Sequence, residues 1–398
     1  MPIKNDNKKQ VVDLIYIEGP GDIVEAFTQW KNQEDVITET SITFSSQVFD
    51  FCKTNQLKSL FISTHAEKKQ AAHLDLIARN IPKKIFKGGV GYHVSQLLYG
   101  LHILLIALRY RPQHLHVTSG VTYWFMLAPL KLFGIQIFPQ FHNTLWPIGF
   151  PPIGGFKRFI LLLDSWFLSN VASAAFCVSS GVKQQLAEIT HNKSCPAYQF
   201  TPQFYRGSFM NPPPAQAHNK KPFNIIFAGR IEQNKGVFDI LDMAEILSED
   251  NVTFQICGDG SALKMLINQI QQRKLVNRVL IHGMLKRSDL LTIYAQAHVV
   301  IIPTRSNFCE GFAMVAAEAI LQGRPIITSS IVPALEVLRS AAIEVTPDDP
   351  VAYAQAIKKL IDDKALYDSI CLACADNREQ FLDGSQGLTK ALIHSLSA

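Results

Sequence analysis

The sequence predicts an α/β protein built from two Rossmann-like, doubly wound domains. Apolar runs of strand length alternate with helical stretches through both halves of the chain. Between the halves, from Phe200 to Pro222, the periodicity breaks at Pro212-Pro213-Pro214 and a polar segment, which is typical of a linker. The chain has 398 residues, of which 47% are apolar, so it is long enough to bury two cores.

The first half opens with a predicted strand from Val11 to Ile17. The turn Glu18-Gly19-Pro20-Gly21 closes it, and a helix is expected over Asp22 to Trp30, the usual start of a Rossmann-like unit. This turn lacks the G-x-G-x-x-G pattern of a dinucleotide site. Later in this half we expect strands over 58–64, 114–118, 135–139 and 174–179, and helices over 45–55 and 93–109. We interpret the glycine cluster Gly88 to Gly91 as a flexible loop.

The second half alternates more regularly between predicted strands and helices. Strands are expected over 224–228, 252–257, 278–282, 298–302, 325–327 and 341–345, which predicts a parallel sheet covered on both faces. We divide the chain into a first domain (1–205), a linker (206–222), a second domain (223–375) and a helical C-terminal segment (376–398).

The segment from Pro303 to Thr328 carries the strongest functional pattern. Two buried strands enclose a helix expected over Phe312 to Leu321, with Glu310 just before this helix and Glu318 two turns inside it. At about 1.5 Å rise per residue the two backbones lie roughly 10–12 Å apart, about the span of a diphosphate that carries a sugar at each end. The free N–H groups at the start of the helix favour an anion between the two carboxylates.

This pattern, EGFAMVAAEA followed by GRP, resembles the donor-site signature of family 4 glycosyltransferases. The resemblance implies the GT-B fold, in which two Rossmann-like domains face a central cleft and the C-terminal segment crosses back onto the first domain. It also implies retaining transfer of a sugar from a nucleotide sugar to a hydroxyl acceptor, which is a lipid, a glycan or a small natural product. One departure is Ala313, where the family more often has Gly.

A second motif, Gly229-Arg230 followed by Lys235-Gly236, is similar to the diphosphate-binding G-R-x(4)-K-G of the same family. Breaking the glycosidic bond places negative charge on the leaving diphosphate, and preorganised cations stabilise that charge. Arg230 offers a planar fork of donors and Lys235 a point charge. The two glycines leave room for close backbone approach and begin a helix whose N–H groups also face the anion.

The resemblance assigns further roles residue by residue. Glu318 would bind the ribose hydroxyls and Glu310 the transferred sugar, while the backbone around Met314 and Val315 would contact the phosphates. Met284 would flank the base. The donor site implied in this way also contains Gly229, Gly311, Phe312 and Ala313.

Two features of the first half have competing interpretations. His142 follows a predicted strand and matches a cleft-facing histidine of the family, although a lone histidine is more often an ordinary hydrogen-bonded residue. Gly19 or Gly21 matches the family's turn beside the donor phosphates, although a tight turn explains both glycines and the Gly88–Gly91 cluster is a rival. We count His142 with Arg230, Lys235 and Glu310 as candidate catalytic residues.

No cofactor or metal is expected. The carboxylates are not spaced as a D-x-D pair, the histidines are dispersed, and Cys371-x-x-Cys374 lacks a partner pair. The seven scattered cysteines suit a reducing compartment, and the polar N-terminus does not read as a signal peptide. No run of 18 purely apolar residues occurs, so we expect no spanning helix and a cytoplasmic protein.

The net charge of +5 is unevenly distributed. Leu76 to Leu163 contains no Asp or Glu but nine basic residues. Two interpretations remain open: a surface for an anionic substrate or the inner, anionic face of a membrane, or solvated cations around buried helices. The basic residues lack a stripe of stacking aromatic residues, which argues against nucleic acid.

Two further functional classes also remain open. A sugar-nucleotide epimerase of similar fold would bind the same donor without an acceptor. A non-catalytic sugar-nucleotide or membrane-surface binding protein would keep the fold without turnover.

Overall fold

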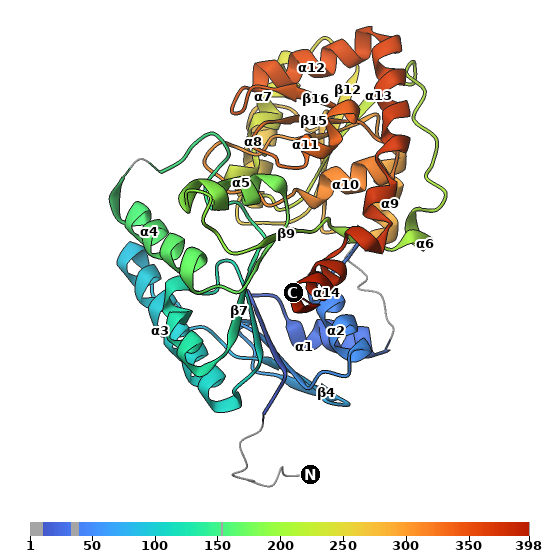
Figure 1. Ribbon diagram of the computed structural model, residues 1–398. Coiled ribbons are helices and arrows are strands. Elements are labelled where there is room, and N and C mark those ends of the chain that lie inside the picture. Colours follow the sequence, from blue (N-terminus) through green and yellow to red (C-terminus); the bar gives the residue numbers. More distant parts are fainter. Residues whose placement is uncertain (1–10, 33–39, 153, 398) are drawn as a thin grey trace.

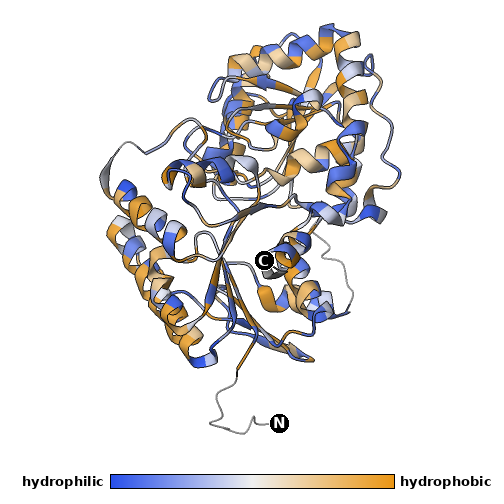
Figure 2. Ribbon diagram, viewed as in Figure 1, coloured by the Kyte–Doolittle hydropathy of each residue, from blue (hydrophilic) through white to orange (hydrophobic). Residues whose placement is uncertain are grey.

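A computed structural model describes residues 11–32, 40–152 and 154–397. The chain forms two sheets, each covered by helices, and the sheets lie in separate halves of the molecule (Figure 1). The predicted two-domain α/β class is therefore confirmed. Apolar residues alternate with polar ones along most helices, while the central strands are rich in apolar residues (Figure 2). Strands of that kind are expected in a parallel sheet that is buried on both faces.

Eight strands form the sheet of the first domain, in the order β4-β5-β3-β1-β6-β7-β8-β9. All neighbouring strands are parallel except β4 and β5, which form an antiparallel hairpin at one edge. The strands are β1 (Leu14–Glu18), β3 (Ser59–Ser63), β4 (Gln70–His73), β5 (Leu76–Asn80), β6 (His114–Thr118), β7 (Gln136–Phe141), β8 (Ala175–Cys177) and β9 (Ala197–Gln199). A separate antiparallel pair joins β2 (Ser41–Ile42) to β10 (Gln203–Phe204).

Two helices of the first domain, α2 and α5, are capped by a side chain at the N-terminus. Thr43 accepts a hydrogen bond from the backbone N–H of Ser46, and Ser179 accepts one from Val182, so each hydroxyl satisfies a free donor of the first turn. The helices are α1 (Ile23–Asn32), α2 (Phe44–Thr54), α3 (Gly88–Tyr110), α4 (Gly155–Asn170), α5 (Ser180–Ile189) and α6 (Arg206–Phe209), with a 3₁₀ segment η1 (Trp124–Phe133).

Six parallel strands form the sheet of the second domain, in the order β13-β12-β11-β14-β15-β16. This is the 3-2-1-4-5-6 order of a Rossmann-like sheet, in which the strand order reverses between β11 and β14. The strands are β11 (Phe223–Ala228), β12 (Val252–Cys257), β13 (Val279–Gly283), β14 (Val299–Ile302), β15 (Ile326–Ser329) and β16 (Ala342–Val345). Ligands in such folds bind at the carboxyl ends of the strands beside the reversal.

The helices of the second domain continue into a C-terminal segment that returns to the first domain. The helical elements are η2 (Gln233–Lys235), α7 (Asp239–Ile246), α8 (Leu263–Gln272), α9 (Arg287–Gln296), α10 (Met314–Leu321), α11 (Leu335–Leu338), η3 (Arg339–Ala341), α12 (Pro350–Asp362), α13 (Lys364–Asp376), η4 (Glu379–Phe381), η5 (Gly384–Gln386) and α14 (Leu388–Ser397). Helix α14 packs on α2, and the backbone N–H of Leu388 donates to Gln47 at 3.0 Å (Figure 1).

One expectation about these elements was wrong. The cluster Gly88 to Gly91 is the first turn of α3 and not a loop. Its three glycines have a low helix propensity, so the sequence pattern did not show where the helix starts. The segment expected as a linker, 200–222, also contains β10 and α6. In the described part of the chain, α3 is long and apolar enough to cross a membrane by length and composition alone.

Candidate functional site

A cavity of about 560 Å³ opens between the two domains at the carboxyl ends of their strands. Residues after β11 and β14 line it from the second domain, and residues after β7 line it from the first. The strand order of the second sheet reverses between β11 and β14, so the cavity lies where Rossmann-like folds bind ligands. Of the predicted site residues, the lining includes His142, Gly229, Arg230, Lys235, Met284, Glu310, Gly311, Phe312, Ala313, Met314, Val315 and Glu318.

The loop that carries Arg230 and Lys235 is fixed by close backbone packing. Gly236 has φ of 72°, and a Cβ atom there would lie 2.0 Å from the carbonyl oxygen of Pro303. Only glycine therefore lets this loop pass so near the end of β14. The residues from Gln233 to Lys235 form a 3₁₀ turn, and α7 begins only at Asp239. The expectation that a helix starts at Gly236 and faces the anion was wrong.

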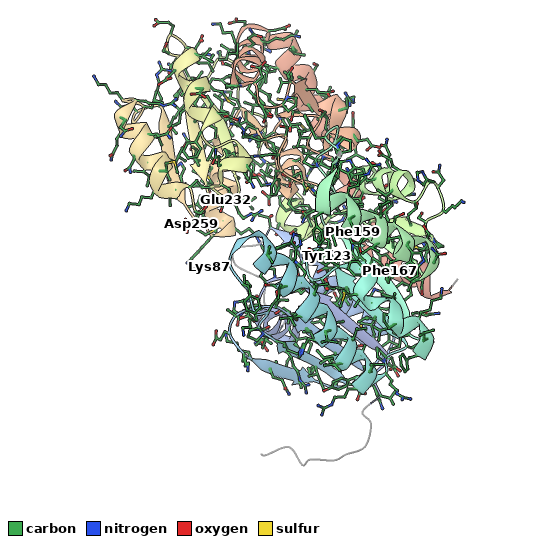
Figure 3. All side chains as sticks on the ribbon, turned by 90° about the vertical axis from the view of Figure 1, so that its left-hand side faces the viewer. Lys87, Tyr123, Phe159, Phe167, Glu232 and Asp259 are labelled. Carbon is green, nitrogen blue, oxygen red and sulfur yellow. The ribbon has the colours of Figure 1, made fainter. Side chains whose placement is uncertain are left out.

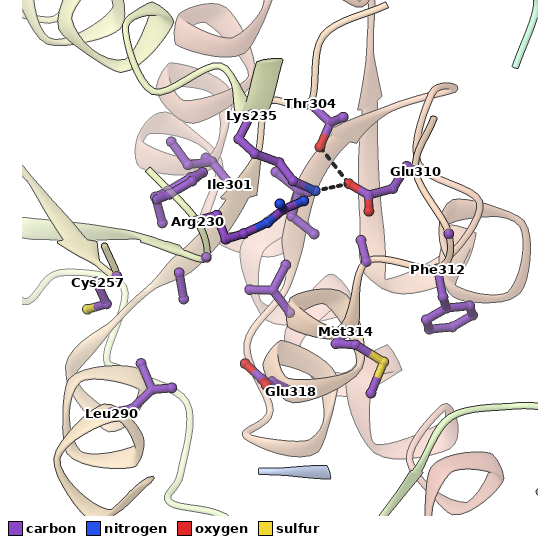
Figure 4. A pocket seen from close by; sticks show the side chains of 18 of the residues that line it. Arg230, Lys235, Cys257, Leu290, Ile301, Thr304, Glu310, Phe312, Met314 and Glu318 are labelled. Atoms are coloured by element: carbon purple, nitrogen blue, oxygen red, sulfur yellow. Dashed lines mark hydrogen bonds and ion pairs between the residues drawn. The ribbon is translucent and has the colours of Figure 1, made fainter. Parts of the chain in front are cut away.

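Lys235 and Glu310 form an ion pair inside this cavity (Figure 4). The side chains are 17% and 8% exposed, so the pair is largely removed from solvent. Thr304 also donates its hydroxyl to the same carboxylate oxygen of Glu310 at 3.0 Å. The Lys235 ammonium lies 4.3 Å from the centre of the Phe308 ring, which adds a cation–π contact. These contacts hold the Glu310 carboxylate in one orientation and hold the Lys235 ammonium beside it.

The start of α10 faces the cavity because two special backbone positions precede it. At Gly311 a Cβ atom would lie 1.9 Å from the carbonyl oxygen of His142, so the first and second domains touch there. The backbone N–H of Thr144 donates to the Glu310 carbonyl at 3.2 Å across the same contact. Ala313 has φ of 66°, in the left-handed region, which explains why the family more often has Gly at this position.

Glu318 lies on α10 and joins elements from both domains. The hydroxyl of Tyr294, which is buried on α9, donates to its Oε2 atom at 2.8 Å. Thr40 of the first domain donates its hydroxyl to Oε1. These two hydrogen bonds fix the orientation of the Glu318 carboxylate in the wall of the cavity. Figure 4 shows the Glu318 carboxylate and the Glu310 carboxylate on different sides of Arg230.

His142 follows β7 and contributes to the cavity from the first domain. Its ring packs on Phe44 with 4.6 Å between ring centres, and its Nε2 atom lies 2.6 Å from the Gln140 amide nitrogen. Burial lowers the pKa of His142 to about 4, so the ring is neutral at pH 7. A neutral imidazole can donate or accept a hydrogen bond but adds no charge to the site.

Gly19 and Gly21 line a second cavity of about 650 Å³ rather than the first. The two cavities share Phe44, His142 and Met314, so they adjoin. The sequence analysis treated Glu18 only as part of a turn, yet this carboxyl also lines the second cavity. Burial raises the pKa of Glu18 to about 8. An acidic residue directly after the first strand of a Rossmann-like sheet was the signal that could have identified it.

Several neighbours of the predicted site carry no signal in the sequence. Phe44 and Asn143 of the first domain and Thr304 of the second line the main cavity, while Phe308 contacts the two cations. An apolar wall at one end of the cavity is formed by Met284, Leu285 and Leu290. Such a wall suits a flat ring. Cations, a helix start and carboxylates on either side together suit a diphosphate flanked by two hydroxyl-bearing groups.

Within the described ranges, no group of three or more His, Cys, Asp or Glu side chains is arranged to hold a metal ion. Cys371 and Cys374 lie on α13 as free thiols, and burial raises the pKa of both. These thiols lie outside the lining of the cavity.

Comparison with known proteins agrees with this geometry. Residues 211–373 match the family described as "Glycosyl transferases group 1". The glycogen synthase of Mycobacterium tuberculosis is 28% identical over 148 residues, which cover 36% of this chain and 35% of that protein. The chain thus aligns with about a third of the length of this curated relative.

Solved structures resemble the whole chain. Sucrose-phosphate synthase from Thermosynechococcus elongatus matches with a TM-score of 0.70 and 16% identity, covering 97% of this chain and 98% of that one. Anabaena Alr3699/HepE in complex with UDP-glucose matches with a TM-score of 0.65 and 16% identity, covering 97% and 99%. The chain has the GT-B fold, in which two Rossmann-like domains face a cleft.

Proposed function

We propose that the protein is a retaining glycosyltransferase that moves a sugar from a nucleotide-sugar donor to a hydroxyl acceptor. One observation carries the proposal: Arg230, Lys235 and the start of α10 face a single interdomain cavity that also contains Glu310 and Glu318. The match of residues 211–373 to group 1 glycosyltransferases and the UDP-glucose bound by the Anabaena protein support it.

In this proposal the donor lies along α10. Its diphosphate meets Arg230, Lys235 and the backbone N–H groups near Met314 and Val315. The ribose hydroxyls meet Glu318, and a hydrogen bond from the Tyr294 hydroxyl fixes the orientation of this carboxylate. The base lies against Met284 and Leu290. The transferred sugar meets Glu310. His142 is neutral and faces the sugar as a hydrogen-bonding group.

The reaction breaks the bond between the sugar anomeric carbon and the diphosphate oxygen. A new bond forms from the acceptor oxygen to the same face of that carbon, and the acceptor proton passes to the departing phosphate oxygen. Arg230 and Lys235 stabilise the charge that this oxygen gains, and both are in place before the reaction. The acceptor enters through the second cavity, which adjoins the first at Phe44, His142 and Met314.

A thermal-shift screen of UDP-, GDP- and ADP-sugars tests the donor assignment. We expect one base to raise the melting temperature of the wild-type protein, and the rise to be lost in Arg230→Ala. The matched control is Arg339→Ala, which removes an arginine whose side chain is 66% exposed and is not among the residues that line the main cavity. No shift with any nucleotide sugar would contradict the proposal.

The preferred donor is then incubated with and without candidate acceptors, and the products are followed by NMR. Transfer with the donor's anomeric configuration preserved supports the retaining reaction, whereas inverted product contradicts it. A changed sugar nucleotide in the absence of acceptor would indicate an epimerase. Donor binding without any product, across lipid, glycan and small-molecule acceptors, would indicate a binding protein.

A further inference from the structure

Helix α3 presents a long apolar stripe to the outside of the first domain. Val90, Val94, Leu97, Leu101 and Leu105 recur at helical spacing and are 80%, 39%, 40%, 49% and 59% exposed. Only a third of the most apolar 18-residue window of α3 is buried. A helix that is apolar all round is normally buried all round, so the outer half of α3 lacks the cover that its composition predicts.

Helix α4 extends the same surface with large aromatic side chains. Phe156, Phe159, Leu162 and Trp166 are each at least half exposed, at 52%, 54%, 61% and 52%. The ring of Phe156 lies 4.5 Å from that of His93 on α3, so the two helices meet at their N-terminal ends. Figure 2 shows apolar colouring along both helices, and Figure 3 turns this side toward the viewer. We name the exposed apolar residues of α3 and α4 the α3–α4 face.

The segment that contains α3 and most of α4 carries charge of one sign only. Residues 76–163 contain no acidic residue, and Asp164, the one acidic residue of α4, is buried and accepts a hydrogen bond from the Phe125 backbone at 3.0 Å. Exposed basic residues gather at the N-terminal ends of the two helices: Lys84, Lys87, Lys157 and Arg158. A cationic rim beside exposed leucine and aromatic side chains is the composition of surfaces that lie in the interface of anionic bilayers.

The opposite face of α3 determines how the helix can meet a bilayer. Tyr99, Ile103 and Ala107 are buried in the core of the first domain. Crossing a membrane would expose this side to lipid and remove it from that core, whereas lying flat leaves it packed. The geometry therefore favours a helix that lies on a bilayer over one that spans it.

We propose that the α3–α4 face docks the protein on an anionic lipid bilayer. The apolar side chains enter the headgroup region, and Lys84, Lys87, Lys157 and Arg158 meet the lipid phosphates. The N-terminal ends of α3 and α4 follow β5 and β7, whose carboxyl ends lie on the edge of the sheet that faces the cavity. Figure 3 shows Lys87 at the end of α3 nearest the second domain. Docking thus brings the cleft close to the bilayer surface.

The position of the basic residues also indicates the chemical class of the acceptor. This inference rests on the proposed function. A cleft held at headgroup level can receive a hydroxyl on a lipid-linked molecule without extracting the lipid tail from the bilayer. The acceptor class that this arrangement favours is therefore a lipid headgroup or a glycan that is attached to a lipid.

Vesicle sedimentation without any nucleotide sugar tests the docking. Full-length protein is mixed with vesicles of phosphatidylcholine alone or of equal amounts of phosphatidylcholine and phosphatidylglycerol. We expect binding to the mixed vesicles that weakens as salt is raised, and little binding to phosphatidylcholine alone. Equal partitioning to both vesicles, or none to either, overturns the proposal.

Two variants locate the surface. Leu98→Gln with Leu101→Gln and Leu105→Gln should lower the vesicle-bound partition coefficient roughly tenfold or more, because each side chain loses apolar contact with the bilayer. The matched control changes exposed apolar residues of the second domain: Met265, Ile267 and Leu372, each to Gln. If both triple variants bind equally, the α3–α4 face is not the docking surface.

The charge variant Lys84→Gln with Lys87→Gln and Lys157→Gln should lower the partition coefficient by on the order of a hundredfold. Its control changes exposed lysines of the second domain, Lys264, Lys274 and Lys359, to Gln. A self-associating protein would instead show a concentration-dependent dimer in sedimentation velocity that the leucine variant abolishes, with no vesicle binding. That outcome would show that the α3–α4 face binds a second copy of the chain, and it would overturn the proposal that this face binds a bilayer.

The donor site is tested separately. Lys235→Ala should bind mixed vesicles like the wild-type protein. Failure of the nucleotide-sugar screen with intact vesicle binding contradicts the proposed function, whereas intact donor binding without vesicle binding contradicts only the docking.

Discussion

Lys235 and Glu310 form an ion pair in the wall of the interdomain cavity, although 75 positions separate them in the chain. Each was expected to contact a different part of the donor. Their pairing means that, in the proposed function, the cation that meets the diphosphate and the carboxylate that meets the sugar orient one another before any ligand binds. Preorganisation of this kind reduces the reorganisation needed as charge develops in the transition state.

Lys235→Ala should lower transfer by about a hundredfold to a thousandfold, because it removes one preorganised cation from the leaving group. It also leaves the Glu310 carboxylate without its cation, at a cost of about 1–3 kcal/mol of stability. Initial rates and thermal melting measure the two effects. The double variant with Glu310→Ala should recover part of the melting temperature and none of the activity. Wild-type rates in Lys235→Ala would refute the role of this lysine.

Glu318→Ala should raise the apparent KM for the donor about tenfold to a hundredfold, because it removes the acceptor of the ribose hydroxyl bonds. Steady-state kinetics at varied donor concentration provide the measurement. Tyr294→Phe is the matched control, since it removes only the 2.8 Å hydrogen bond behind the carboxylate and should change KM less. A larger effect of the tyrosine variant would show that Glu318 serves packing rather than the donor.

Ala313→Gly should stabilise the protein by about 1 kcal/mol. The backbone of Ala313 is left-handed, and this conformation is higher in free energy for a residue with a Cβ atom than for glycine. Melting by circular dichroism should show a rise of about 1–2 °C, because a chain of 398 residues has a large unfolding entropy. Gly311→Ala, two positions earlier, is the contrasting variant. Its Cβ would meet the His142 carbonyl, so it should push the domains apart and lower both stability and transfer. A lower melting temperature for Ala313→Gly would contradict this account.

The pKa of Glu18, about 8, predicts a pH-dependent stability. The ordinary pKa is 4.5, so between these values the folded protein binds more protons than the unfolded chain. The stabilisation is therefore complete below pH 4.5 and is lost as pH rises through about 8. Glu18→Gln cannot titrate. The melting temperature of the wild type should fall relative to this variant between pH 5 and 9, and parallel curves would mean that the pKa of Glu18 is ordinary.

Transfer should be undiminished in excess EDTA. Arg230, Lys235 and the α10 N-terminus supply the positive charge that a divalent cation would otherwise bring to the diphosphate. Initial rates with EDTA, and with EDTA followed by excess Mg²⁺ or Mn²⁺, measure the dependence. Complete loss with EDTA and recovery with metal would contradict the prediction.

Several elements of the second domain could be predicted closely from the sequence. The strand over 252–257 has the predicted bounds, and Gly229, Arg230 and Lys235 line the same cavity as the two carboxylates of E-x(7)-E. Each motif is local: a strand end, a turn that needs glycine, and a helix start lie within a few residues of one another. Parallel strands then bring the separate motifs to one edge of the sheet.

Contacts between the domains could not be predicted in the same way. Phe44 and Asn143 line the cavity, and Thr40 contacts Glu318, because of how the two sheets pack and not because of any local pattern. The turn that holds Gly19 and Gly21 belongs to the adjoining cavity for the same reason. The glycine-rich start of α3 was hidden by its low helix propensity.

By itself the sequence determined which residues can bind a charged diphosphate and that two α/β domains carry them, because strand periodicity and turn chemistry are local properties. Only the tertiary structure decided that Lys235 pairs with Glu310, that Glu18 is half-buried beside a second cavity, and that the apolar α3 keeps one side uncovered. Burial and partner choice depend on which surfaces meet in space, and an apolar helix has the same sequence whether protein or another phase covers it.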